Sequence, residues 1–226
     1  MIIPSNTIPY FLGSIASLVF GIKSTQSYLK LKSPLSKHFA ISGYLAALGL
    51  GLYSVPFYLT SNPDILKMCM IMGKLFIDLA AYWQIYLIWY LTELKKFPLM
   101  YFIVPLVMIG SVGYFQQVIH IQNSAVGVVD GVAIYPLAGF YRYTHIFSLL
   151  IVFVAGVILA TKAFEQTETR SRMRLLSIST LYIFASLADI YSAVFLKGLN
   201  DSWVVLVGFV IATGVFLLAT IILTKK

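Results

Sequence analysis

The sequence predicts an all-α membrane protein: a bundle of seven transmembrane helices with the N-terminus outside and the C-terminus in the cytoplasm. The composition, the lengths of the apolar stretches and the distribution of basic residues support this prediction. Of 226 residues, 60% are hydrophobic and only 11% are charged, whereas about a quarter are charged in a soluble domain. No soluble interior of this size hides so much apolar surface, so we expect one membrane domain over residues 1–226.

Seven apolar stretches are each long enough to cross the hydrocarbon core, which takes about 20 helical residues. Because open sheets do not survive in lipid, each stretch is expected to be a helix. Residues 1–9 lack the basic segment that opens a cleavable signal peptide, so the first stretch is expected to direct its own insertion. The predicted spans are Pro9–Tyr28, Phe39–Leu59, Ile65–Leu91, Phe97–Ile119, Tyr143–Ala163, Leu175–Leu196 and Trp203–Leu223.

The basic residues between the spans predict the orientation. Eleven of them lie on one side of the membrane and three on the other, and an excess of Lys and Arg marks the cytoplasmic side. We therefore expect a multi-pass protein of the plasma membrane, and topology rather than nucleic-acid binding explains the net charge of +8. The cytoplasmic set is Lys30, Lys32, Lys37, Lys95, Lys96, Lys162, Arg170, Arg172, Arg174, Lys225 and Lys226, and the outer set is Lys67, Arg142 and Lys197.

One connection is long: more than twenty residues, from His120 to Arg142, join the fourth and fifth spans on the outer side. Within it, Val128-Val129-Asp130-Gly131-Val132-Ala133 places apolar arms around an Asp-Gly turn, which predicts a β-hairpin. The loop is more apolar than a segment that faces water. We expect it to fold back over the bundle as a lid, with an ordinary surface loop as the alternative.

Small residues recur at every fourth position in three spans. Such rows let helix backbones approach closely in lipid, where no hydrophobic force drives helices together. We expect them to pack helices within the monomer, and a homo-oligomer interface is the alternative. The rows are Gly13, Ser17 and Gly21, then Gly43, Ala47 and Gly51, then Gly208 and Ala212.

Ionisable residues inside the spans are candidates for a functional site. Lys74 and Asp78 share one face of the third span, and Asp189 shares a face of the sixth span with Tyr182 and Ser186. At 1.5 Å per residue, Lys74, Asp78 and Asp189 lie roughly 14, 20 and 10 Å below the outer edge. An unpaired charge there costs several kcal/mol. These residues therefore predict a ligand site or pathway, or else a structural pair of Lys74 with Asp78 or Asp189.

Polar residues also gather at the outer mouth, where His120 ends the fourth span and Arg142 and His145 begin the fifth. Bis-imidazole haem takes one histidine from each of two helices, which would suit His120 and His145. Interfacial polar anchors are the favoured interpretation, and we expect no cofactor. Paired metal ligands, nucleophile motifs and phosphate loops are missing from the sequence, so neither a metal site nor an enzyme is expected.

A charged joint, Glu165 to Arg174, connects the fifth and sixth spans on the cytoplasmic side. Glu168 and Arg172 are spaced for a helical ion pair. Positive-inside anchoring is sufficient to explain the arginines. The more specific interpretation is a surface that faces a membrane or cytoplasmic protein partner, formed by Arg170, Arg172 and Arg174.

Three stretches carry a family resemblance: Phe39 to Trp89 with its Asn62-Pro63-Asp64 link, Tyr143-Thr144-His145-Ile146-Phe147-Ser148, and Arg170-Ser171-Arg172-Met173-Arg174-Leu175-Leu176. Together they resemble the seven-helix N-terminal sensor region of bacterial and archaeal histidine kinases, over nearly the whole chain. Those proteins continue into a dimerisation helix and a kinase domain, whereas nothing follows Lys226 in this sequence. The resemblance implies a sensor whose signal passes to a separate protein.

We therefore expect a receptor-like sensor, surrounded by membrane lipid, that binds a small or lipidic ligand from the outer side. The ligand would shift the third, fifth and sixth helices by binding one arrangement better than another. A non-catalytic subunit of a larger complex, such as a respiratory assembly, is one alternative. A small transporter or proton-conducting protein is the other. Microbial rhodopsins share the topology, but they need a lysine in the seventh helix, and Trp203–Leu223 contains none.

Overall fold

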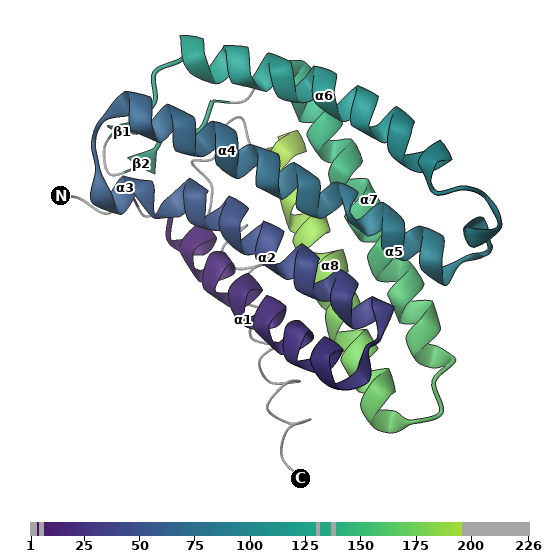
Figure 1. Ribbon diagram of the computed structural model, residues 1–226. Helices are drawn as coiled ribbons and strands as arrows, with labels where there is room; N and C mark the ends of the chain where they lie inside the picture. The colour runs from purple at the N-terminus through teal and green to yellow at the C-terminus, as the bar shows by residue number, and fades with distance from the viewer. Residues whose placement is uncertain (1–3, 5–6, 130–131, 137–138, 196–226) are drawn as a thin grey trace.

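A computed structural model describes residues 4, 7–129, 132–136 and 139–195, and this part of the chain is almost entirely helical (Figure 1). Five of its helices are long and apolar enough to cross a membrane, which supports a multi-pass membrane protein. The predicted seventh span, Trp203–Leu223, lies outside the described residues. The helices are α1 (Ile8–Leu31), α2 (Pro34–Ser54), α3 (Pro56–Leu59), α4 (Pro63–Tyr82), α5 (Gln84–Leu91), α6 (Met100–Asn123), α7 (Gly139–Phe164) and α8 (Thr169–Phe195), with a 3₁₀ turn η2 (Glu93–Lys96) after α5.

Each of the first six predicted spans coincides with a helix or with two consecutive helices. The second span is α2 followed by α3, because Pro56 has no backbone N–H to continue the helical ladder. The third span is α4 followed by α5, interrupted at Trp83. Neither interruption was predicted from the sequence. The charged α4–α5 pair is not among the five helices that qualify as spans by length and hydropathy alone.

Close packing of helix backbones organises the N-terminal half, where α2 lies between α1 and α4 (Figure 1). A Cβ atom on Gly43 would lie 2.8 Å from the Cα of Gly21 on α1. On the opposite side of α2, a Cβ atom on Gly49 would lie 2.9 Å from the backbone nitrogen of Ile77 on α4. Gly43, a member of the predicted row, therefore packs α2 against α1 within the chain as predicted, whereas Gly49 was not part of that row. Gly208 and Ala212 lie outside the described residues.

The loop between α6 and α7, predicted to lie on the outer side, forms the predicted hairpin. Strands β1 (Val128–Val129) and β2 (Val132–Ala133) pair antiparallel, with Val129 opposite Val132. The backbone N–H of Ile134 donates to the carbonyl of Gly127 at 2.9 Å and extends the pairing. The hairpin lies at the end of the bundle where α3 meets α4 (Figure 1). The loop therefore covers one end of the helices.

Two apolar clusters fill the bundle. One joins the outer loop to the ends of α2, α3, α4 and α6. The other lies nearer the α7–α8 joint and is formed by residues of α1, α2, α5, α7 and α8, including Phe20, Phe39, Leu87 and Leu159. Each cluster has buried polar side chains close to it, and these polar groups form the candidate sites.

Candidate functional site

Four ionisable side chains from three helices form a continuous chain of contacts: Asp78, Lys74, His145 and Asp189. We call them the outer tetrad, after the side of the membrane that the sequence predicts for them. On α4, the Lys74 ammonium lies 3.6 Å from Asp78 Oδ1. The same Nζ lies 3.1 Å from His145 Nδ1 on α7. His145 Nε2 in turn lies 3.4 Å from Asp189 Oδ2 on α8. The tetrad therefore links α4, α7 and α8 through charged and polar groups.

The geometry at Lys74 places one proton between two nitrogen atoms. An ammonium can donate to His145 Nδ1 only when that ring nitrogen carries a lone pair. The His145 proton is then on Nε2, from which it faces the Asp189 carboxylate. If the proton moves from the ammonium to Nδ1 instead, the ring becomes an imidazolium and the neutral Lys74 amine is the acceptor. The Lys74–His145 pair thus holds a single positive charge in either arrangement, opposite two carboxylates.

Burial makes this arrangement energetically significant. The side chains of Lys74 and Asp78 are only 5% and 9% exposed, and His145 is buried as well, whereas Asp189 is half-buried. In a medium of low dielectric constant, an isolated charge is strongly disfavoured, and removal of one partner leaves the other uncompensated. We conclude that the four groups are held together as a unit.

The tetrad contains four of the seven residues that the sequence proposed for an outer site. The other three lie elsewhere. Tyr182 is buried on α8 with its hydroxyl beside Ser42 and Gln84. His120 is half-buried near the end of α6, while the two ring nitrogens of His145 face Lys74 and Asp189. Arg142 lies one helical turn before His145, and its buried Nε has no hydrogen-bond partner in the described part of the chain.

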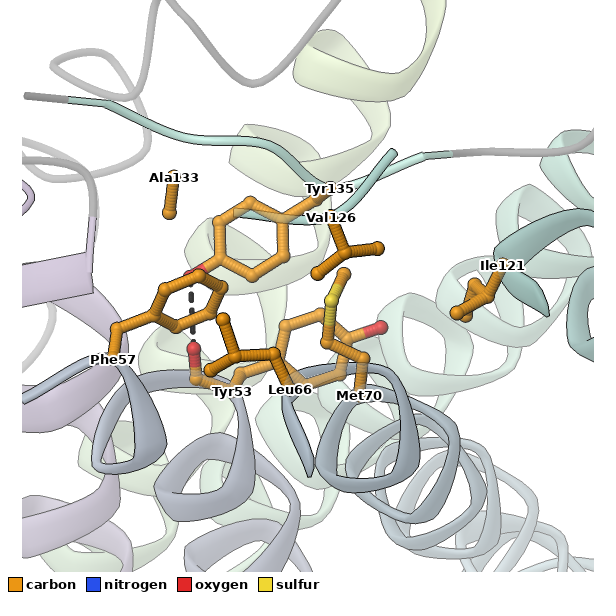
Figure 2. Packing of buried hydrophobic residues seen from close by; sticks show 8 residues of the cluster. All are labelled: Tyr53, Phe57, Leu66, Met70, Ile121, Val126, Ala133 and Tyr135. Carbon is orange, nitrogen blue, oxygen red and sulfur yellow. Dashed lines mark hydrogen bonds between the residues drawn. The ribbon is translucent and has the colours of Figure 1, made fainter. Parts of the chain in front are cut away.

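The loop between α6 and α7 covers one end of the bundle. It inserts side chains into the first of the two apolar clusters, the one at the ends of α2, α3, α4 and α6 (Figure 2). Val126, Ala133 and Tyr135 are all buried there. The Tyr135 ring stacks on Tyr53 of α2 at 5.4 Å between centroids and meets Phe57 edge-on at 5.5 Å. The prediction of a lid that folds back over the bundle is therefore confirmed for this part of the loop.

Two hydrogen bonds fasten this lid to the helices. Gln117 Nε2, on α6, donates to the carbonyl of Pro136 at 2.6 Å. The Tyr135 hydroxyl donates to the backbone carbonyl of Tyr53 at 2.8 Å, as the dashed line in Figure 2 shows. In an unbroken helix that carbonyl would accept from the N–H of Phe57. A carbonyl oxygen has two lone pairs, so the Tyr53 carbonyl can accept this bond from the lid whether or not it also accepts from the helix.

The Tyr135 hydroxyl keeps its hydrogen bond to the Tyr53 carbonyl at neutral and mildly alkaline pH. Burial raises the pKa of its phenol well above the usual value, which is about 10. The hydroxyl therefore remains protonated and continues to donate wherever the protein is folded at neutral or mildly alkaline pH.

We predict that Tyr135→Phe loosens the lid without unfolding the bundle. The substitution keeps the ring contacts and leaves the buried Tyr53 carbonyl without its donor, which costs about 1–3 kcal/mol. Hydrogen exchange followed by mass spectrometry should show faster exchange in residues 126–136 and little change in α1. Tyr143→Phe is a matched control, because Tyr143 is 70% exposed. Equal protection in the Tyr135→Phe variant and the wild type would show that the hydroxyl does not fasten the loop.

A second buried polar group lies nearer the α7–α8 joint and is here called the inner layer: His38, Ser42, Gln84 and Tyr182, with Trp83 beside them. Gln84 Nε2 donates to Ser42 Oγ at 2.7 Å and to the carbonyl of Ala80 at 2.9 Å. His38 Nε2 lies 3.1 Å from Gln84 Oε1. Of these five residues, the sequence proposal included only Tyr182. His38 and Gln84 could have been found as isolated polar residues within apolar stretches.

The charged joint between α7 and α8 differs in one respect from its predicted arrangement. Arg172 lies over the Phe164 ring, with its guanidinium carbon 5.2 Å from the centroid, and Glu168 accepts from the Ser171 hydroxyl at 2.6 Å. Glu168 and Arg172 do not form the predicted ion pair in the described part of the chain, and each side chain contacts another residue instead. Arg174 is exposed. Arg170 is helical, but its side chain lies outside the described part of the structure.

An apolar groove of about 680 Å³ lies in the N-terminal half of the chain, between α1, α2 and the start of α4. Ala47 and Gly51 form part of its lining, and its far end is formed by Pro56, Leu59 and Ile65. The half-buried thiol of Cys69 also lines it. The groove is separate from the tetrad, since none of the four tetrad residues contributes to its lining.

No cluster of three metal-ligating side chains occurs among the described residues. No family model, curated protein or solved structure matches the chain. The functional interpretation therefore depends on the geometry of the outer tetrad, the lid and the joint.

Proposed function

We propose that the chain is a receptor-like sensor with seven spans in the plasma membrane, its N-terminus outside and its C-terminus in the cytoplasm. A small or lipidic ligand reaches it from the outer side and changes the arrangement of α4, α7 and α8. The signal leaves through the α7–α8 joint to a separate protein partner, as the resemblance to the sensor regions of histidine kinases implies. The observation that supports this proposal best is the outer tetrad, which joins those three helices beneath a fastened lid.

The tetrad suits a sensor because its contacts depend on one another. A ligand group that binds Lys74 or Asp189 competes with His145, and His145 belongs to the helix that leads to the joint. Since α7 and α8 pack along their lengths, a rotation of either helix at the tetrad is transmitted toward Lys162 and Arg172. A ligand shifts such an equilibrium only by its difference in affinity for the two arrangements.

The proposal is tested by asking whether a change at the tetrad moves the joint. Spin labels are attached at Lys95→Cys and Thr167→Cys, two exposed positions, in a Cys69→Ala background. Pulsed electron–electron double resonance then measures the distance distribution between them in lipid nanodiscs. We expect Lys74→Met to shift or broaden the distribution.

Lys67→Met is the matched control, since Lys67 lies two turns earlier on the same helix and donates to the carbonyl of Gln122 rather than to the tetrad. We expect the control to leave the Lys95–Thr167 distances unchanged. If Lys74→Met also leaves them unchanged while the protein remains folded, the tetrad does not communicate with the joint. The sensor proposal would then be wrong.

The seven-span orientation makes a separate prediction. In a Cys69→Ala background, a cysteine at the exposed position Ala125 is expected to react with a membrane-impermeant thiol reagent in intact cells. A cysteine at Thr167, also exposed, is expected to react only after the membrane is opened. The reason is the eleven-to-three distribution of basic residues. If only the Thr167→Cys variant is labelled in intact cells, the orientation is the reverse of the one proposed.

Proton conduction is a second candidate, favoured by the proton that Lys74 and His145 share. Intramembrane Asp, His and Lys residues in contact with one another are typical of proton relays. Purified protein in liposomes that contain a pH-sensitive dye would test it under an imposed potential. Conduction predicts a proton flux that Lys74→Met abolishes and Lys67→Met leaves intact. A flux equal to that of empty liposomes would exclude this candidate and leave the sensor proposal untouched.

A further inference from the structure

The inner layer contains several buried polar atoms without hydrogen-bond partners. His38 Nδ1, Trp83 Nε1 and the Tyr182 hydroxyl are all buried, and none of them has a partner among the residues that the structure describes. His38 and Tyr182 are 1% and 8% exposed as whole residues. A buried polar group without a partner is costly, so native proteins rarely keep one, and three in one place call for an explanation.

All three atoms lie around the same pair of side chains, His38 and Gln84. The Trp83 ring stacks on the His38 ring, with an interplanar angle of 13° and 5.8 Å between centroids. The Tyr182 hydroxyl lies beside Gln84 and Ser42 without meeting the geometry of a hydrogen bond to either. Three elements of the bundle, α2, the α4–α5 break and α8, thus direct polar groups to one buried place.

The hydrogen bonds already made determine whether each remaining polar atom is a donor or an acceptor. A backbone carbonyl only accepts, so the Gln84 atom that faces the Ala80 carbonyl must be the amide nitrogen. Gln84 Oε1 therefore faces His38, and His38 Nε2 must carry the proton that it receives. In the neutral ring, Nδ1 is then an acceptor. The three groups are one acceptor at His38, one donor at Trp83, and a hydroxyl at Tyr182 that does both.

The interruption of the third span lies at this place. Trp83 separates α4 from α5, and the N–H of Tyr86 donates to the Trp83 carbonyl at 3.2 Å, three residues back rather than four. The Gln84 side chain supplies a donor to the Ala80 carbonyl at this interruption. Trp83 itself keeps helical dihedral angles, with φ −59° and ψ −22°, so the interruption is a local disturbance of the helical ladder. Insertion of a water molecule is one known cause of such a disturbance.

We propose that the inner layer is a binding site for a small uncharged molecule that both donates and accepts hydrogen bonds, namely ordered water bridging His38, Trp83 and Tyr182. A water molecule accepts from the indole N–H, donates to His38 Nδ1 and completes its bonds at the phenol. Buried waters typically make about three such bonds. The site is distinct from the tetrad, since Gln84 lies ten residues, or roughly 15 Å along the helix, beyond Lys74.

The effect of Tyr182→Phe on thermal stability separates a bridged site from a dry one. If the hydroxyl has no partner, its removal relieves a buried unsatisfied group and raises Tm or leaves it unchanged. If water bridges it, its removal breaks the bridge and lowers Tm by several degrees. Tyr90→Phe is the control, because Tyr90 lies on α5, the helix that follows Trp83, with an exposed side chain, and it should change Tm little.

The second measurement is the coupling between two groups that do not touch. Trp83→Phe keeps an aromatic ring and removes the indole N–H. We expect the loss of Tm in the Tyr182→Phe/Trp83→Phe double variant to be smaller than the sum of the single losses, because both changes break one bridge. Trp83→Phe combined with Tyr90→Phe should give additive losses. Additive losses in both double variants would overturn the proposal.

Infrared spectroscopy then identifies water as the bridge. Reconstituted protein is compared in H₂¹⁶O and H₂¹⁸O, since only oxygen–hydrogen stretches of water itself shift on this exchange. We expect an isotope-sensitive band of strongly bonded water in the wild type and in Tyr90→Phe, and its loss in Tyr182→Phe. A spectrum without any difference between wild type and Tyr182→Phe, together with an unchanged or raised Tm, would show that the inner layer is dry.

Discussion

Lys74→Met is expected to lower the free energy of unfolding by about 3–5 kcal/mol, the usual consequence of leaving one partner of a buried ion pair uncompensated. The methionine side chain fills a similar volume, so the loss arises from charge rather than from a cavity. Asp78 would lose the ammonium that lies 3.6 Å from its Oδ1. Thermal or denaturant unfolding in detergent measures the change, and Lys67→Met again serves as the control.

Double-variant cycles resolve which members of the tetrad interact. Lys74→Met combined with Asp78→Asn should be more stable than the sum of the two losses predicts, by about 1–3 kcal/mol, because the contact is direct. Lys74 and Asp189 should show a smaller coupling, because His145 lies between them. That coupling should disappear in a His145→Phe background. Strictly additive effects for Lys74 with both carboxylates would show that the tetrad is not a unit, and the outer site would lose its support.

Gly43→Ala is expected to have an effect of similar size through a different cause. The added methyl would lie within 3.0 Å of the Cα and N of Gly21 and the carbonyl oxygen of Ser17, all of them backbone atoms. Backbone cannot rotate away as a side chain does, so α1 and α2 must separate and lose the packing that holds them together in lipid. We expect a loss of about 3 kcal/mol or more, comparable to severe overpacking, measured as the fall in Tm.

Two other glycines make this prediction specific. At Gly51 the methyl would meet only the Ser14 hydroxyl, at 3.1 Å, and a small loss is expected because that side chain can turn. At Gly139, in α7, the methyl would meet nothing within 4 Å, so alanine should be neutral or slightly stabilising. A Gly43→Ala variant as stable as Gly139→Ala would mean that α1 and α2 do not approach as closely as described.

Much of this architecture follows from the sequence because hydropathy and small-residue spacing are local signals. The apolar stretches predicted the helices to within a few residues, and Gly43 and Gly51 predicted a packing face. The proline at position 56 could have predicted the break in the second span. The break at Trp83 could not, since no Pro or Gly lies there and its stabilising contact is a side-chain bond from Gln84.

The outer site was predicted in part for the same reason. Lys74 and Asp78 lie on one helix, so their spacing alone places them on one face. Which residue bridges them to Asp189 depends on how three helices pack, and no spacing in the sequence contains that information. The sequence assigned Tyr182 to the outer site because it lies only two turns from Asp189 on one helix. In the structure its hydroxyl faces Ser42 and Gln84 instead.

The lid bond has a consequence for how the protein is made. Tyr135 and Tyr53 are 82 residues apart, and a chain synthesised from its N-terminus completes α2, α3 and α4 well before it reaches the hairpin. Through that interval of biogenesis, the aromatic rim around Tyr53 and the Lys74–Asp78 pair are in place without a cover. A nascent chain arrested before Val126 would therefore present this end of the bundle to chaperones and lipids without the contacts that Tyr135 makes in the finished protein.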